Sequence, residues 1–321
     1  MMHRLDAVDL APAVSVPVAA ASPSVTFADP ALVASGWYPI LAAKKLRGQG
    51  PWQGSVAGRK LVAWKDPAGN FTVADGHCAH LGANLAEGQV TAQGLVCPFH
   101  GWCWKTTGQA CGPGSDATRQ LRTYTTQERW GLVWAWLGGK SPAKFPDAPD
   151  DWHAWRLPAR TVACHPHLVL ANGFDLMHLG QAHQLDVQSA VLAHEDGEVA
   201  LRYEAHVRPS PMRRVLGVAG KSVDATFRSH GASLVYAQVR SPVRFDALFC
   251  ATPDGHGSSV SQAILFLPRR RSALRVLALL LDMVAVDGPL LEGLRFRRQF
   301  APSDSALAAY AQRVDRVEAW T

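Results

Sequence analysis

The feature of this 321-residue sequence that most constrains its fold is a pair of short motifs, each holding one cysteine and one histidine. Cys78 and His80 form the first pair, and Cys97 and His100 form the second, with sixteen residues between His80 and Cys97. Two thiolates and two imidazoles can bind metal together only where the fold brings the segments that carry them into contact. The chain therefore has to build a small domain around two metal-binding loops.

The composition of this ligand set favours a [2Fe–2S] cluster. Two cysteines can hold one iron as thiolates, while two neutral histidines hold the other iron and raise the reduction potential. Zinc is the competing metal, but zinc fingers usually place both cysteines in one short pair and both histidines in another. Here each pair is mixed, and Gly82 and Gly101 permit tight loops that bring backbone N–H groups toward the sulfurs.

The segments HCAHLGANLAEGQV (77–90) and LVCPFHGWCW (95–104) resemble the Rieske non-haem iron oxygenases. Rieske proteins of respiratory bc-type complexes carry an extra cysteine in each loop, where this chain has Ala83 and Phe99. The resemblance therefore points to the oxygenase or ferredoxin branch and to a reducing compartment, for which we expect the cytoplasm. The first segment and VDGPLL (286–291) are most similar to the aminopyrrolnitrin N-oxygenase-like and ketosteroid-hydroxylase-like branches.

The length of the chain separates the two remaining branches. A Rieske ferredoxin needs only about 100 residues, whereas roughly twice that length follows the second pair here. The segment from Asn172 to His183 resembles the iron-binding segment of the oxygenases. The resemblance implies that His178, His183 and a later carboxylate hold a mononuclear Fe(II) with open positions for O₂.

Helix geometry limits how this segment can bind one metal. Asn172, Asp175 and His178 recur every three residues and would share one face of a helix. His183 lies five residues beyond His178 and would point about 140° away on a continuous helix. We therefore expect the helix to be interrupted, with Gly180 as a breaker or as the site of a π-type irregularity. Without the resemblance, an amphipathic helix with histidines at its polar edge would explain the segment equally well.

Asp287 is our choice for the carboxylate ligand of the mononuclear iron. The family supplies this ligand from a late helix, and the apolar run LRVLALLLDMVAV (274–286) leads into Asp287. Asp282 and Glu292 remain competitors. Asp282 lies five residues earlier, so it faces elsewhere on a continuous helix and could be a surface or capping charge.

The resemblance also implies an assembly. In related oxygenases the aspartate before the two iron histidines bridges to a cluster histidine of a neighbouring subunit, which here means Asp175 and His100. Such a head-to-tail contact closes naturally into a homotrimer. The alternative for Asp175 is an ordinary carboxylate on a helix surface.

Side chains around the iron segment are candidates for binding a small substrate. An apolar or aromatic molecule is favoured because pockets of this kind are mostly apolar with few polar anchors. For the apolar candidates the alternative is ordinary core packing. The candidates are Asn172, Phe174, Met177 and Leu179.

The expected fold class is α+β, with an N-terminal all-β Rieske domain followed by an antiparallel-sheet domain. We place a flexible leader at 1–35, the Rieske domain at 36–141 and the catalytic iron domain at 150–321. Glu198 to Arg208 alternates apolar and polar residues, which is typical of a half-buried strand. The family's catalytic domain has the helix-grip form, like START and Bet v1 proteins. Further strands are expected at 60–64, 71–74, 124–137, 233–239, 245–252 and 258–267.

Composition and charge exclude several classes of protein. The run at 273–286 contains Arg275 and Asp282 and is shorter than the roughly 18 apolar residues of a membrane span. The net charge of +6 comes without a recognisable nucleic-acid-binding module. The arginines at 269–271 and at 295, 297 and 298 could instead guide an acidic electron-donor protein.

The resemblance implies a terminal oxygenase that uses O₂ and electrons originating from NAD(P)H. No dinucleotide-binding fingerprint is present, so nicotinamide and flavin are expected on a separate ferredoxin or flavin reductase. The reaction could be a hydroxylation, N-oxidation, desaturation or demethylation. The alternative is an electron-transfer or ligand-binding protein whose downstream iron site is vestigial.

Overall fold

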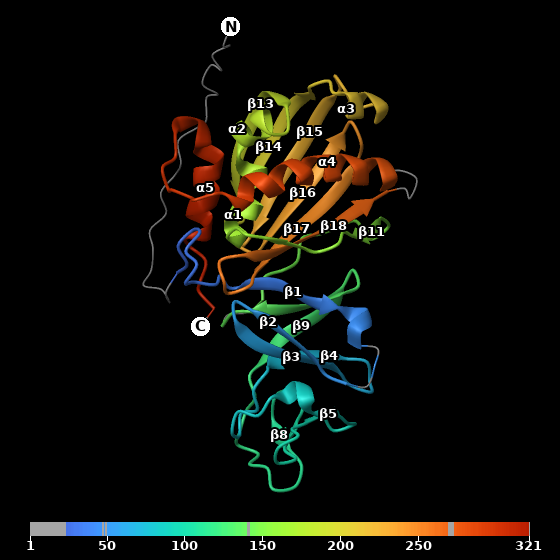
Figure 1. Ribbon diagram of the computed structural model, residues 1–321, viewed down its shortest axis with the longest axis vertical. Coiled ribbons are helices and arrows are strands. Elements are labelled where there is room, and N and C mark those ends of the chain that lie inside the picture. The colour runs from blue at the N-terminus through green and yellow to red at the C-terminus, as the bar shows by residue number, and fades with distance from the viewer. Residues whose placement is uncertain (1–23, 47, 49, 140–141, 269–272, 321) are drawn as a thin grey trace. The chain divides into compact units, whose positions relative to one another are not determined.

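The structure is a computed structural model that describes residues 24–320 except 47, 49, 140–141 and 269–272 (Figure 1). The chain divides into two compact units. The cluster unit comprises Ser35–Ala143 together with Thr252–Gly257, and the sheet unit comprises residues 24–34, Lys144–Ala251 and Ser258–Trp320. Together they confirm the expected α+β class, with an all-β unit first and a large antiparallel sheet with helices second.

The cluster unit contains two sheets built from antiparallel pairs. The six-stranded sheet has the order β1 (Gly36–Ala42), β10 (Leu132–Leu137), β9 (Thr123–Arg129), β4 (Phe71–Asp75), β3 (Arg59–Lys65) and β2 (Trp52–Val56). The smaller sheet contains β5 (Gln89–Val90), β6 (Leu95–Val96), β7 (Cys103–Trp104) and β8 (Ala110–Cys111). Two 3-10 turns, η1 (Ala43–Leu46) and η2 (Leu85–Glu87), complete it.

Tryptophans fill the interior of this unit. Trp64, Trp104 and Trp134 are fully buried. Trp130 instead forms the two-residue turn between β9 and β10 with Gly131, and both residues have positive φ (53° and 71°). A turn of this kind matches the right-handed twist of the strands that it joins.

The sheet unit is organised around one eight-stranded sheet. Its order is β11 (His153–Arg156), β18 (Ser259–Leu267), β17 (Phe245–Pro253), β16 (Leu234–Ser241), β15 (Ser222–His230), β14 (Glu198–Val207) and β13 (Leu185–Glu195), with β12 (Arg160–Val162) also paired to β18. Val199, Leu201, Tyr203, Ala205 and Val207 of β14 are buried, and from Arg202 onward they alternate with exposed polar residues. The period-2 pattern thus places one face of the sheet in the core.

Helices cover that face of the sheet (Figure 1). They are α1 (Pro166–Ala171), η3 (Asn172–Phe174), α2 (Leu176–Gln181), α3 (Pro211–Val215), α4 (Ala273–Glu292), η5 (Pro302–Asp304) and α5 (Ser305–Val314). Phe174 and Tyr310 stack with ring centroids 4.6 Å apart, which joins the η3 turn to α5 in the core. None of the described helices is both long enough and apolar enough to cross a membrane.

Residues 24–34, the last part of the expected flexible leader, pack against the rest of the sheet unit. Val25 and Phe27 are buried, and isolated bridges join Ser24 to Glu318 and Ala34 to Ala319. The reason is that Phe27 finds an aromatic partner in Tyr310 of α5, a contact between residues far apart in the sequence. The rest of the leader, residues 1–23, and the arginines at 269–271 lie outside the described residues.

Candidate metal centres

The structure brings the four cysteine and histidine residues of the paired motifs together. Cys78 and Cys97 are both buried, and their thiols lie within hydrogen-bonding reach of each other. The rings of His80 and His100 lie side by side with centroids 4.8 Å apart, and His100 is exposed. A pair of neighbouring thiols and a pair of neighbouring imidazoles are the donor types of a [2Fe–2S] cluster with two cysteine and two histidine ligands.

The two loops repeat one hydrogen-bonding pattern. The backbone N–H of Cys78 donates to the carbonyl of Ala83 (2.8 Å), and that of Gly82 donates back to the carbonyl of Cys78 (2.8 Å). In the second loop the backbone N–H of Cys97 donates to the carbonyl of Trp102 (2.7 Å), and that of Gly101 donates to the carbonyl of Cys97 (3.1 Å). Gly82 and Gly101 occupy the same place in each loop with φ of 80° and 74°, a conformation that costs glycine little.

The surroundings of these side chains fit a bound metal. Burial raises the pKa of the Cys78 thiol, although the Nε1–H of Trp104 donates to its sulfur at 3.3 Å. A buried thiol of this kind becomes a thiolate when a metal replaces its proton. Nδ1 of His80 is buried and has no hydrogen-bond partner among the described residues, while the His80 ring stacks on Trp102 with centroids 4.1 Å apart. A ring nitrogen without a protein partner is available to a metal.

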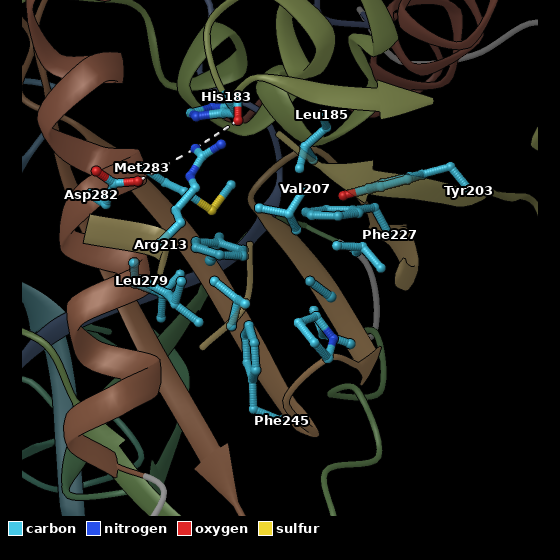
Figure 2. A pocket seen from close by; sticks show the side chains of 17 residues that line it. His183, Leu185, Tyr203, Val207, Arg213, Phe227, Phe245, Leu279, Asp282 and Met283 are labelled. Carbon is cyan, nitrogen blue, oxygen red and sulfur yellow. Dashed lines mark hydrogen bonds and ion pairs between the residues drawn. The ribbon is translucent and has the colours of Figure 1, made fainter. Parts of the chain in front are cut away.

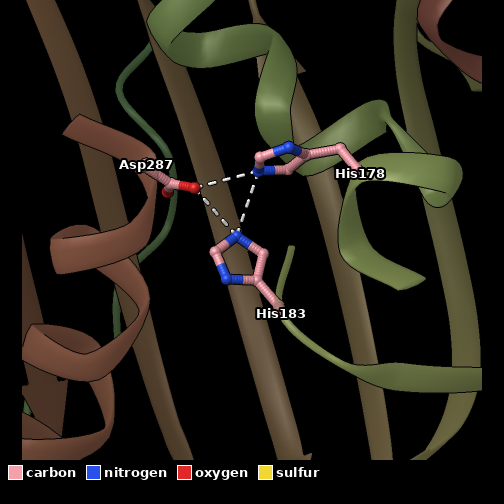
Figure 3. Close-up of side chains that lie close together, drawn as sticks. All are labelled: His178, His183 and Asp287. Atoms are coloured by element: carbon pink, nitrogen blue, oxygen red, sulfur yellow. Dashed lines mark hydrogen bonds and ion pairs between the residues drawn. The ribbon is translucent and has the colours of Figure 1, made fainter. Parts of the chain in front are cut away.

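A second group of ligands lies in the sheet unit. Nε2 of His178 is 3.1 Å from Nε2 of His183 and 2.9 Å from Oδ1 of Asp287 (Figure 3). Nε2 of His183 is 3.0 Å from the same carboxylate oxygen. His178 lies on α2, His183 lies on the loop that follows α2, and Asp287 lies on α4. Their three donor atoms converge and form a 2-His-1-carboxylate set.

The chain reaches this arrangement by ending the helix between the two histidines. Asp175 caps α2 by accepting a hydrogen bond from the N–H of His178 (2.8 Å). The helix ends at Gln181, and Gln184 follows with a φ of 52°. An interruption was expected from the spacing, but Gly180 lies inside the helix and is not the breaker.

The position of Asn172 differs from the prediction that it shares one helix face with Asp175 and His178. It begins the separate 3-10 turn η3, and Asp175 has an extended backbone with φ −101° and ψ 93°. The extended residue breaks the helical repeat, because it is used as the cap of the next helix. Asn172 therefore does not share a helix face with Asp175 and His178.

Charge stabilises the three ligands even without a metal. Burial opposes ionisation of Asp287, but hydrogen bonds from His178 and His183 outweigh it and lower the pKa of this carboxyl to about 2. The same hydrogen bond to Asp287 raises the pKa of His178 against the effect of burial. Nδ1 of His183 is buried and has no hydrogen-bond partner in the part of the chain that the structure describes. A negative carboxylate facing two ring nitrogens is an arrangement that attracts a divalent cation.

Arg213 of α3 was not anticipated from the sequence. Its guanidinium donates to the carbonyls of His183 (2.7 Å) and Gln184 (3.3 Å) and pairs with Asp282 of α4 at 3.4 Å. Asp282 is thus occupied by Arg213, and Glu292 is exposed at the end of α4. No short motif marks Arg213, because its partners lie about 30 and 70 residues away and meet it only in the fold.

An apolar cavity that is partly open to solvent reaches His183 (Figure 2). Its lining comprises His183, Leu185, Tyr203, Val207, Arg213, Val218, Val223, Phe227, Ala237, Val239, Pro242, Phe245, Phe249, Leu279, Leu280, Asp282 and Met283. None of the four candidate substrate-contact residues lines it. Phe174 and Leu179 pack in the core, Met177 is exposed, and Asn172 lies in η3.

Comparison with protein families gives a match in each unit. Residues 36–125 match the model described as Rieske [2Fe-2S] domain. Residues 137–273 match the model described as 3-ketosteroid 9alpha-hydroxylase C-terminal domain. Asp287 lies beyond both matches, so its place in the site depends on geometry.

Two curated proteins are similar in sequence. The aminopyrrolnitrin oxygenase of Pseudomonas fluorescens is 27% identical over 283 residues, covering 76% of this chain and 77% of that protein. The oxygenase component of 3-ketosteroid-9-alpha-monooxygenase from Mycobacterium tuberculosis is 34% identical over 140 residues, covering 40% of this chain and 36% of that protein. The match to this second relative thus spans little more than a third of its length.

Solved structures share the fold. Dicamba monooxygenase bound to dicamba superposes with a TM-score of 0.69 at 19% identity, over 91% of this chain and 98% of that one. NdmA of Pseudomonas putida CBB5 with caffeine gives a TM-score of 0.69 at 18% identity, over 87% and 89%. At these identities the likeness establishes the architecture of the chain.

Proposed function

Because the chain belongs to the Rieske non-haem iron oxygenases, we propose that it uses O₂ to oxidise an apolar or aromatic small molecule. The observation that carries this proposal is the convergence of His178, His183 and Asp287, with His183 also lining an apolar cavity. A molecule in that cavity would lie beside the metal site, where oxidation has to take place.

Two metal groups would be held by the residues described above. Cys78, Cys97, His80 and His100 would hold the [2Fe–2S] cluster, and His178, His183 and Asp287 would hold Fe(II). When bound, these groups supply single electrons and a site for O₂. The protein's part is to fix the ligands, orient the substrate and limit access of water. The largely apolar lining around Phe227 and Phe245 serves the last two purposes.

Electrons would come from NAD(P)H through a separate ferredoxin or flavin reductase. The exposed apolar side chains of Leu81 and Phe99, 66% and 65% accessible, flank the cluster ligands and support a protein contact there. We further propose a cytoplasmic homotrimer in which Asp175 of one subunit faces His100 of the next. The cap to His178 uses Oδ1 of Asp175, and among the described residues no hydrogen bond is made to its other carboxylate oxygen, which supports this role.

The type of oxidation is proposed only as a class. The names of the similar proteins include an aminopyrrolnitrin oxygenase and a 3-ketosteroid-9-alpha-monooxygenase. Hydroxylation, N-oxidation, desaturation and demethylation are all compatible with an apolar cavity beside an O₂-binding iron. A product screen with a surrogate reductase, O₂ and aromatic, steroid and amine compounds, read by mass change, would identify the reaction.

Metal counting tests the proposal directly. After anaerobic reconstitution we expect about three irons per chain, two in the cluster and one in the mononuclear site. His183→Ala should lose the mononuclear iron and all O₂-dependent product while keeping the visible spectrum of the cluster. His194→Ala, an exposed histidine on β13, is the matched control and should behave like the wild type. Only two irons in the wild-type protein would favour an electron carrier instead.

A further inference from the structure

The cavity beside the triad of His178, His183 and Asp287 contains four polar or charged side chains among its described lining. Three of them already interact with other residues. His183 belongs to the triad, and Arg213 and Asp282 pair with each other. The fourth is Tyr203, which is only 3% exposed and whose hydroxyl makes no hydrogen bond with any described residue. Because no described residue pairs with this hydroxyl at the cavity wall, a molecule bound in the cavity can accept its hydrogen bond.

Tyr203 is fixed so that its hydroxyl reaches the cavity. It comes from the centre of β14, where Ala190 and Ala225 are its small neighbours on the adjacent strands. Its ring packs nearly parallel to Phe227, with centroids 6.0 Å apart. Figure 2 shows the hydroxyl oxygen pointing toward the space between Val207 and Phe227. Strand β14 and the ring of Phe227 therefore hold the Tyr203 ring in place, while its hydroxyl faces the cavity.

The charge state of Tyr203 makes it a hydrogen-bond donor. Burial raises the pKa of its phenol far above the usual value near 10. At neutral pH the group is therefore an O–H and not a phenolate. The hydroxyl makes no hydrogen bond within the described lining, which is apolar apart from His183, Arg213 and Asp282.

We propose that Tyr203 is a substrate-binding residue whose hydroxyl donates to a single acceptor, such as a carbonyl oxygen, on an otherwise apolar and uncharged molecule. This inference rests on the proposed function and names the chemistry of its substrate. Specificity would come from the acceptor, because an analogue without it leaves the buried hydroxyl unpaired.

The same lining disfavours an anionic substrate. The Arg213 guanidinium donates to the carbonyls of His183, Gln184 and Arg208 as well as to Asp282. With these partners it has little capacity left to bind a carboxylate. A charge moved into such an apolar cavity without a partner is strongly disfavoured.

Matched probes test this inference by binding alone. Fluorenone and fluorene have the same ring skeleton and differ by one carbonyl oxygen, and fluorene-9-carboxylate adds a negative charge. Equilibrium dialysis against the reconstituted protein should show that fluorenone binds more tightly than fluorene by about three- to tenfold, the value of one hydrogen bond. The carboxylate should bind at least tenfold more weakly than fluorenone.

The variant Tyr203→Phe keeps the ring and removes the donor. It should reduce fluorenone binding to the level of fluorene and leave fluorene binding unchanged. Tyr310→Phe removes a buried hydroxyl elsewhere in the same unit, in the packed core, and should preserve the preference for fluorenone. Equal loss of both probes in Tyr203→Phe, or an equal affinity of the wild type for both, would overturn the inference.

Failure of all three probes to bind the wild type would also overturn it, because the cavity would then not accept ring systems of this size. The proposed function is judged separately by iron content and O₂-dependent product. Loss of the fluorenone preference in a protein that still holds mononuclear iron would therefore reject only the role of Tyr203.

Discussion

At the scale of single residues, Arg213 links two ligand-bearing segments that share no sequence proximity. It holds the loop carbonyls of His183 and Gln184 and reaches Asp282, which lies five residues before the ligand Asp287 on α4. Both the loop and the helix are thereby tied to one buried cation, which is 8% exposed. We infer that Arg213 is a positioning residue for the mononuclear iron.

Substitution of Arg213 by lysine distinguishes the role of the guanidinium geometry from the role of its positive charge. Arg213→Lys keeps the charge, but an ammonium cannot donate to several carbonyls in the planar pattern of a guanidinium. We expect the affinity for Fe(II) to fall by about 10- to 100-fold, as for other residues that orient metal ligands. Asp282→Asn keeps the contacts of Arg213 with the carbonyls and should retain iron.

Fe(II) titration under anaerobic conditions would measure both variants. The cluster spectrum serves as the internal control, because the cluster unit is untouched by either change. Loss of iron in Asp282→Asn with normal iron in Arg213→Lys would show that Asp282, and not Arg213, supports the metal.

At the scale of elements, the segment 24–34 depends on two histidines around α1. His165 caps α1 by accepting from the N–H of His167, and Nδ1 of His167 accepts from the N–H of Ala28 (3.1 Å). The other ring nitrogen of His165 lies 3.2 Å from the carbonyl of Asp29. Since each Nδ1 acts as an acceptor, both histidines have to be neutral to hold the segment.

These histidines predict how stability changes with pH. Burial lowers the pKa of His165 to about 4. Burial also lowers the pKa of His167 well below 6.5, and the nearby His165 acts in the same direction. Below pH 6.5 the unfolded chain binds protons that the folded chain resists. The free energy of unfolding should therefore fall as the pH decreases from about 6.5 to 4, by up to about 3 kcal/mol for His165.

The variant His165→Asn isolates this contribution. Asparagine is also a good N-cap but does not titrate in this range. Urea unfolding between pH 7.5 and 4.5 should show a shallower loss of stability in the variant than in the wild type. Parallel curves for the two proteins would show that His165 does not account for the pH dependence.

At the scale of the whole molecule, the two metal sites belong to separate units of the chain. Cys78, His80, Cys97 and His100 lie in the cluster unit, and His178, His183 and Asp287 lie in the sheet unit. In the proposed ring, Asp175 would connect one subunit's iron histidine to His100 of its neighbour. Light scattering should then give about three times the chain mass of 34.6 kDa.

Replacing Asp175 tests the connection between subunits. Asp175→Asn should preserve the cap of α2, since asparagine caps helices as well as aspartate does. We expect both metals to stay bound, while substrate-coupled oxidation of the reduced cluster slows by on the order of 100-fold. Stopped-flow absorbance of the cluster would report this rate. Asp186→Asn, a surface carboxylate paired with Arg208, is the control, and an unchanged rate in Asp175→Asn would refute the bridge.

Local patterns accounted for much of this architecture. The strands expected at 60–64 and 71–74 fall within β3 and β4, and the alternation at 198–208 corresponds to β14. The spacing of His178 and His183 required a helix end between them, and α2 ends there. The residue that permits the turn was misjudged, because Gly180 fits in a helix while Gln184 adopts the positive φ.

The sequence by itself determined the metal-binding motifs and the order of the two units, because ligand type, spacing and strand alternation are local properties of the chain. Only the tertiary structure decided which late acid faces the histidines, and that Arg213 and Tyr203 belong beside them. Asp282 and Asp287 are chemically alike and five residues apart, so only the rotation of α4 against the sheet distinguishes them. The lining of the cavity comes from strands and helices distant in sequence, and no local pattern records which of their side chains meet.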